Sequence, residues 1–138
     1  MSTLQVGTIK SASSAAPIFQ DSSGTEKGQL AKVWANFNQQ GTLSLRDSFG
    51  VSSISDQGTG RTRINFSTNF SNTDYAVVGA IGQAGTNDDH GNNIMIRDGH
   101  SESSFVLAGR VDIEVHRGSS STAFMDKKTV CLAIFGDN

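Results

Sequence analysis

The sequence has one cysteine, one tryptophan, no long apolar run and no excess of basic residues. The lone cysteine, Cys131, excludes an intrachain disulfide and a zinc site built from several cysteines. Within the apolar run TVCLAIF it is typical of a small buried side chain rather than a reactive thiol. No apolar run approaches the ~18 residues of a membrane-spanning helix, and the N-terminus has neither the basic start nor the apolar stretch of a signal peptide. We therefore expect no membrane insertion.

The charge balance gives no sign of a polyanionic partner. The 138 residues carry 11 Lys and Arg against 13 Asp and Glu, for a formal net charge of −2. A nucleic-acid-binding domain needs a basic face, which this composition does not indicate. We expect no nucleic-acid partner.

The N-terminal stretch is the most unusual part of the composition. Residues 1–28 are mainly Ser, Thr, Ala and Gly with scattered apolar positions, too few to offset the entropy of ordering the segment alone. Such a terminus frays unless something holds it, so we predict an extended arm at 1–28, held by another chain, before a domain at 29–138. The apolar residues expected to make the attachment are Leu4, Val6, Ile9, Ile18 and Phe19.

The remaining sequence has the two-residue period of β-strands. Apolar residues alternate with polar ones over Leu43 to Val51 and over Arg61 to Phe66. The segment FVLAGRVDIEVH (105–116) is predicted to be one half-buried strand, with Phe105, Leu107, Val111, Ile113 and Val115 on one face and Arg110, Asp112, Glu114 and His116 on the other.

Two segments, YAVVGAIG (75–82) and TVCLAIFG (129–136), are apolar on both faces. This pattern predicts central strands covered on both sides, with a neighbouring subunit as one candidate for the cover. The weak helical pattern around Ala31 to Phe37 fits a strand better.

Clusters of Gly, Asn, Asp and Ser separate these segments and indicate turns. They fall at residues 38–41, 55–60, 69–74, 83–93, 98–104 and 118–122. Short strands at this spacing predict an all-β fold, an antiparallel β-sandwich or jelly roll of about eight strands preceded by the arm.

Motifs that carry chemistry are scarce. There is no nucleophile elbow and no phosphate-binding loop. The loop at 85–93 contains the oxygen ligands Asp88, Asp89, Asn92 and Asn93, which leaves a calcium site open. Its spacing is not that of an EF-hand, so an exposed loop is the preferred interpretation. His90, His100 and His116 lack paired ligand spacing, and we expect neither a metal nor a cofactor.

The best candidate for acid–base chemistry is the row Arg110, Asp112, Glu114 and His116. Two carboxyls two residues apart on a strand approach the separation of paired-carboxylate glycosidases. The same pattern is typical of a solvated or intersubunit sheet face, and sugar-cleaving sites usually have more aromatic residues than the one Trp and one Tyr present here. We expect that the protein is not an enzyme, with a polysaccharide depolymerase as a minor alternative.

Residues 28–82 resemble a domain of structural proteins of tailed bacteriophages, especially marine and cyanobacterial phages. The residues that carry the resemblance are Lys32, Trp34, Asn36, Phe37, Asn38, Ser48, Phe49, Val51, Ser52, Ser53, Ile54, Asp56, Gly58, Thr59, Gly60, Ile64, Asn65, Phe66, Tyr75, Ala76, Val77 and Val78. The arm, with Leu4, Val6, Ile9 and the sequence SSGTE, is similar to the leader of such proteins. A weaker likeness extends to the closing segment Thr129 to Gly136. Departures occur at Val33, Ala35 and Gly50, and residues 84–123 carry no part of the resemblance, which leaves their specificity open.

The resemblance implies a virion protein, a homotrimeric tail-fibre head that recognises the host. It places Trp34, Phe37, Phe49 and Tyr75 in the core of the oligomer and docks the arm on other virion proteins. The residues expected to face a host cell-surface glycan are Asn87, Asp88, Asp89, His90, Asn92, Asn93, His100 and Ser120. A capsid decoration or head-fibre protein, anchored on the shell through the arm, is the alternative.

Overall fold

The computed structural model describes residues 5–10, 19–82, 93–97, 106–116 and 124–136. The chain divides into two compact units, Met1–Leu30 and Ala31–Asn138. This division lies beside the boundary expected between residues 28 and 29. The described residues include no helix long and apolar enough to cross a membrane.

The first unit contains a short antiparallel hairpin of β1 (Phe19–Gln20) and β2 (Glu26–Gly28). The Asp21 carboxylate holds its turn, because it accepts hydrogen bonds from the backbone N–H groups of Ser23 and Thr25 (2.9 and 3.0 Å) and pairs with Lys27 at 3.0 Å. A hydrogen bond from the Ser23 hydroxyl is the main reason that the pKa of Asp21 falls to about 2. This part of the predicted extended arm is therefore a hairpin, and every described residue up to Leu30 is exposed.

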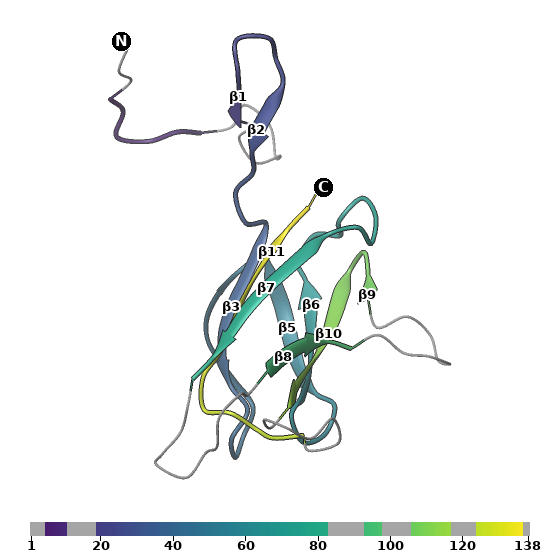
Figure 1. Ribbon diagram of the computed structural model, residues 1–138. Coiled ribbons are helices and arrows are strands. Elements are labelled where there is room, and N and C mark those ends of the chain that lie inside the picture. Colours follow the sequence, from purple (N-terminus) through teal and green to yellow (C-terminus); the bar gives the residue numbers. More distant parts are fainter. Residues whose placement is uncertain (1–4, 11–18, 83–92, 98–105, 117–123, 137–138) are drawn as a thin grey trace. The chain divides into compact units, whose positions relative to one another are not determined.

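The second unit consists of two antiparallel sheets, which confirms the all-β prediction (Figure 1). One sheet has the order β4 (Ser44–Phe49), β3 (Val33–Asn38), β11 (Val130–Phe135) and β7 (Ala76–Ile81). The other has the order β5 (Val51–Asp56), β6 (Arg61–Phe66), β10 (Arg110–His116) and β8 (Asn93–Ile96), with β9 (Val106–Leu107) paired to β10. The strand predicted around Ala31 to Phe37 is confirmed as β3, and the closing strand as β11.

The two sheets form a sandwich-like pair of layers around one core. Burial alternates along β3, β6 and β11, because successive side chains of a strand point to opposite faces. The core residues are Val33, Ala35, Phe37, Ile64, Phe66, Phe70, Tyr75, Val111, Ile113, Val115, Val130, Leu132 and Ile134. Phe66, Phe70 and Tyr75 pack as an aromatic cluster, with ring centroids 4.8 to 5.7 Å apart.

The alternation from Leu43 to Val51 covers two strands rather than one. Gly50, with φ of 70°, lies between β4 and β5, which belong to different sheets. A left-handed residue lets the chain turn this corner, and glycine adopts it without steric cost. Leu43 and Val51 pack against the core, whereas Phe49 lies opposite Trp34 on the outer face, because the register between β3 and β4 shifts at a bulge between Asn36 and Phe37. The alternating apolar residues of this segment therefore do not share one face, and their period did not reveal the change of sheet.

The segment 105–116 is also two strands, which corrects the prediction of one. Its described part is a hairpin in which Leu107 pairs with Arg110 and Val106 with Val111. The Tyr75 hydroxyl donates to the carbonyls of Leu107 (3.1 Å) and Arg110 (2.8 Å). Burial raises the pKa of Tyr75 to about 12, so the hydroxyl stays protonated and holds both sides of the turn.

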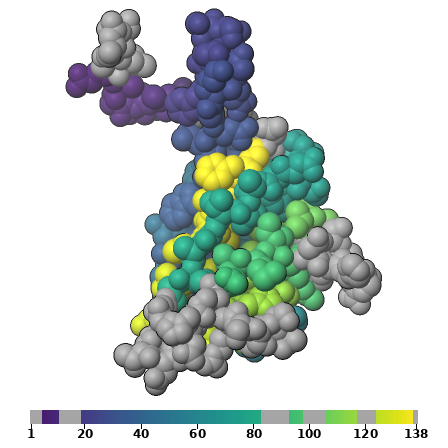
Figure 2. All heavy atoms as spheres, viewed as in Figure 1, coloured from purple at the N-terminus to yellow at the C-terminus, as the bar shows by residue number. Residues whose placement is uncertain are grey.

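The two strands with apolar faces on both sides have different positions. β11 is central, between β3 and β7, as predicted, whereas β7 lies at an edge of its sheet, so that prediction was wrong. Figure 2 shows atoms of β7 and β11 at the surface of the view. On this face of β7, Val78 is 54 % exposed.

Candidate functional site

A row of apolar side chains crosses the outer face of the β4-β3-β11-β7 sheet. Strand register places Phe49 opposite Trp34, Trp34 opposite Ala133, and Ala133 opposite Val78. The residues at the two ends of the row are the most exposed, Phe49 at 59 % and Val78 at 54 %, and Trp34 between them is 37 % exposed. Each of these four residues belongs to a different strand, and neighbours in the row are register partners, so the row spans all four strands of the sheet.

Further apolar residues extend this row in both directions. Cys131 is opposite Ala80, and Phe135 is opposite Ala76. We call the whole set the apolar band: Phe49, Trp34, Ala133, Val78, Cys131, Ala80, Phe135 and Ala76. Beyond it the face becomes polar at Asn36 and Asp47, where Arg46 donates to the Asn36 side-chain oxygen at 3.1 Å.

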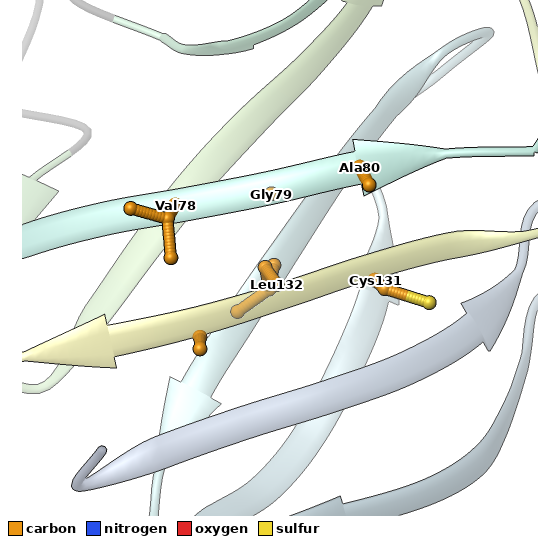
Figure 3. Close-up of a pocket in the computed structure, with 6 residues that line it drawn as sticks. Val78, Gly79, Ala80, Cys131 and Leu132 are labelled. Carbon is orange, nitrogen blue, oxygen red and sulfur yellow. The ribbon is translucent and has the colours of Figure 1, made fainter. Parts of the chain in front are cut away.

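The small side chains of β7 and β11 leave a shallow depression within the band. It has a volume of about 360 Å³ and is lined by Val78, Gly79, Ala80, Cys131, Leu132 and Ala133 (Figure 3). Cys131 is half-buried there, and not fully buried as the sequence pattern predicted. An uncharged, open and nearly flat surface of this kind suits contact with another protein surface better than enclosure of a small polar molecule.

The four residues expected in an oligomer core separate into two pairs. Trp34 and Phe49 lie on the exposed outer face. Phe37 and Tyr75 are only 0 % and 8 % exposed, and they lie inside the core of the single chain. That part of the expectation is corrected: Phe37 follows Trp34 by three residues, so strand alternation points it to the opposite, inner face.

The outer face of the other sheet is polar and charged. We call it the arginine face: Arg61, Arg63, Arg97, Arg110, Asp112, Glu114 and His116. Its clearest contact joins Arg63 to Asp112, which lie opposite each other in β6 and β10. Nε and one terminal nitrogen of Arg63 bind the two Asp112 oxygens at 2.8 and 2.9 Å. This bond raises the pKa of Arg63.

Glu114 is shared among several donors. Its Oε1 is 3.0 Å from Arg61 Nε and 3.3 Å from Arg97 Nε, and its Oε2 is 3.1 Å from His116 Nε2. The Arg61 guanidinium also stacks on the Phe124 ring, with its central carbon 4.0 Å from the ring centroid. Such a contact holds the guanidinium flat against the aromatic face.

These contacts bear on the acid–base interpretation of the row 110–116. The Asp112 side chain is 2 % exposed and that of Glu114 14 %, and each is bound by arginine. The oxygens of both carboxylates already accept strong, charge-assisted hydrogen bonds from arginine. The geometry therefore favours the sheet-face interpretation that the sequence left open beside catalysis.

Sequence reasoning named the β10 residues of this face but not their partners. Arg61, Arg63, Arg97 and Phe124 were not predicted as site residues. A signal existed for two of them, because R-x-R in 61–63 and D-x-E in 112–114 carry opposite charges at the same spacing and pair in antiparallel strands. For Arg97 and Phe124 no local pattern was available.

Most of the predicted receptor-facing residues lie outside the described part of the chain. These are Asn87, Asp88, Asp89, His90, Asn92, His100 and Ser120, as are Leu4 and Ile18 of the predicted attachment set. Asn93 is not in a loop but begins β8, opposite His116, and this prediction is corrected. Val6, Ile9 and Phe19 are exposed. Within the described ranges, no three His, Cys, Asp or Glu residues are grouped so that they could hold a metal ion.

No protein-family profile, curated protein or solved structure matches the chain.

Proposed function

We propose that the chain is a structural protein of a tailed-bacteriophage virion, which forms a homotrimeric tail-fibre head and recognises the host surface. The exposed apolar band carries the self-association part of this proposal. Apolar surface that crosses a whole sheet is costly to leave in water, and burying it against sister copies removes that cost. The resemblance of residues 28–82 supports the virion assignment and the number of copies.

The N-terminal unit supports attachment to other virion proteins. Every described residue from Gln5 to Lys10 and from Phe19 to Leu30 is exposed, including the apolar Val6, Ile9 and Phe19. A segment whose described residues are all exposed gains stability by docking on another chain. In this proposal the N-terminal unit is the anchor, and the band closes the trimer.

The test of self-association compares two charge substitutions. Val78→Glu introduces a carboxylate into the apolar band, and Met95→Glu introduces one at a similarly exposed position on the other sheet, since Val78 is 54 % and Met95 50 % exposed. By sedimentation equilibrium, the wild type and Met95→Glu should show about three times the 14.6 kDa chain mass. Val78→Glu should sediment as a monomer with an unchanged circular dichroism spectrum, because an unpaired charge is costly at an apolar contact.

A monomeric wild type at micromolar concentration would contradict the trimer. A trimer that Val78→Glu leaves intact would contradict the band as its interface. Immunogold labelling of particles then tests the location: label at the tail supports the fibre head, and label on the shell supports the decoration protein instead.

A further inference from the structure

Among its described residues, the arginine face carries three arginines on β6 and β10 and two carboxylates on β10. Arg61, Arg63 and Arg110 accompany the carboxylates of Asp112 and Glu114. The chain as a whole has a net charge of −2. The positive surplus is therefore a local feature of one sheet face.

Both carboxylates are already engaged. Arg63 binds the two oxygens of Asp112, and Glu114 contacts Arg61, Arg97 and His116. Arg110 has no such pairing: within the described part of the chain, its Nε is buried and has no hydrogen-bond partner. Buried charged donors are nearly always satisfied in native proteins, so an orphaned one indicates a missing acceptor.

The backbone around Arg110 is firmly positioned. Its carbonyl accepts the Tyr75 hydroxyl at 2.8 Å, and it pairs with Leu107 across the β9–β10 hairpin and with Asn65 in β6. Arg110 precedes Asp112 by two residues on the same face of β10, about 7 Å along the strand. An acceptor at Arg110 would thus lie beside the Arg63–Asp112 pair.

We propose that Arg110, with the neighbouring Arg63, binds an oxyanion, the carboxylate or sulfate group of an acidic saccharide. The planar guanidinium fork matches these groups, and the Arg63–Asp112 pair is an example of that geometry on this face. The face belongs to the sheet opposite the apolar band, so trimer formation through the band leaves it open to ligand. The oxyanion site rests on the observations above, and the saccharide as its carrier rests on the proposed function.

The test measures binding by the full chain to three polymers: polygalacturonate with carboxylates, dextran sulfate with sulfates, and neutral dextran. The variants are Arg110→Gln, Arg110→Lys and the control Lys128→Gln, which removes the same charge from an exposed position next to the other sheet. The wild type should bind an acidic polymer and not dextran, and Arg110→Gln should weaken binding about tenfold because a charge-assisted hydrogen bond is lost. Lys128→Gln should bind the acidic polymer with wild-type affinity. Arg110→Lys should bind it more tightly than Arg110→Gln and more weakly than the wild type.

A second readout is independent of polymer charge. Titration with free glucuronate or inorganic sulfate should shift the ¹⁵Nε resonance of Arg110, and the stronger response identifies the preferred oxyanion. Absence of binding to both acidic polymers, or equal weakening by Arg110→Gln and Lys128→Gln, would overturn the proposal. Sedimentation of the same samples separates the two ideas: a trimer without binding refutes the oxyanion site alone, and a monomer with Arg110-dependent binding refutes the trimer alone.

Discussion

At the scale of single residues, Gly50 combines a left-handed backbone with a crowded Cβ position. It lies between two strands of different sheets with φ of 70°, and a Cβ placed on it would collide with the backbone carbonyl of Lys32 and crowd Val33 at 3.2 Å. Gly41 has nearly the same φ, 69°, but open space around the Cβ position. Alanine substitutions at the two glycines therefore distinguish the cost of backbone strain, which both share, from the cost of steric overlap, which only Gly50 has.

We predict that Gly50→Ala lowers the free energy of unfolding by about 3 kcal/mol, whereas Gly41→Ala lowers it by about 1 kcal/mol. Both alanines must adopt the unfavourable left-handed backbone conformation, and only the alanine at position 50 must also displace the backbone carbonyl of Lys32. Urea denaturation followed by tryptophan fluorescence measures both values. Equal losses would show that the collision at the sheet corner relaxes without cost.

At the scale of elements, the β1–β2 hairpin depends on one carboxylate. Asp21 accepts from Ser23 and Thr25 and pairs with Lys27, and its pKa in the folded hairpin is about 2, below the ordinary 3.8. Because the pKa of Asp21 is lower in the folded hairpin than in the unfolded chain, the ionised carboxylate stabilises the hairpin at pH values above the unfolded pKa of 3.8. This stabilisation is lost as the pH falls through the folded pKa of about 2.

We therefore predict that the hairpin is intact at pH 5 and loses the contribution of Asp21 between about pH 4 and pH 2. NMR titration of the Asp21 carboxyl carbon and the Thr25 amide should show one shared transition near pH 2. In Asp21→Asn the side-chain oxygen still accepts hydrogen bonds but does not ionise, so the Thr25 amide should lose this transition. An Asp21 that titrates near 3.8 would contradict the hydrogen-bonded turn.

At the scale of the whole molecule, the two units differ in what stabilises them. All core residues fall between Val33 and Ile134, and no described residue up to Leu30 is buried. We predict that deletion of residues 1–30 leaves the thermal midpoint within about 2 °C of the full chain, as measured by calorimetry. Under the proposed function, the shortened protein should no longer join the virion.

The matched deletion at the other end should behave differently. Removing residues 124–138 takes away β11, the strand between β3 and β7, and with it the buried Val130, Leu132 and Ile134. That protein should not fold. If instead the deletion of 1–30 unfolds the chain, the two units are not energetically independent.

The all-β class, β3, β11 and the turns at 38–41, 55–60 and 69–74 could be predicted from sequence because they depend on local patterns, and the other predicted turns, at 83–93, 98–104 and 118–122, fall on residues outside the described part of the chain or at its edge. Alternating apolar residues in β6 and β10 define an inner and an outer face wherever those strands are placed, and Gly, Asn and Asp end strands through their own backbone preferences. The charged row from Arg110 to His116 was visible for the same reason. None of these features depends on which strand pairs with which.

Tertiary structure alone decided which strands are neighbours, and with them both candidate surfaces. The apolar band exists because register aligns Phe49, Trp34, Ala133 and Val78 from four strands that are distant in sequence. Arg63 and Glu114 acquired their partners in the same way, and Phe37 and Tyr75 moved from an expected interface to the interior. Burial and ion pairing are properties of contacts between distant segments, so a pattern read along one segment does not contain them.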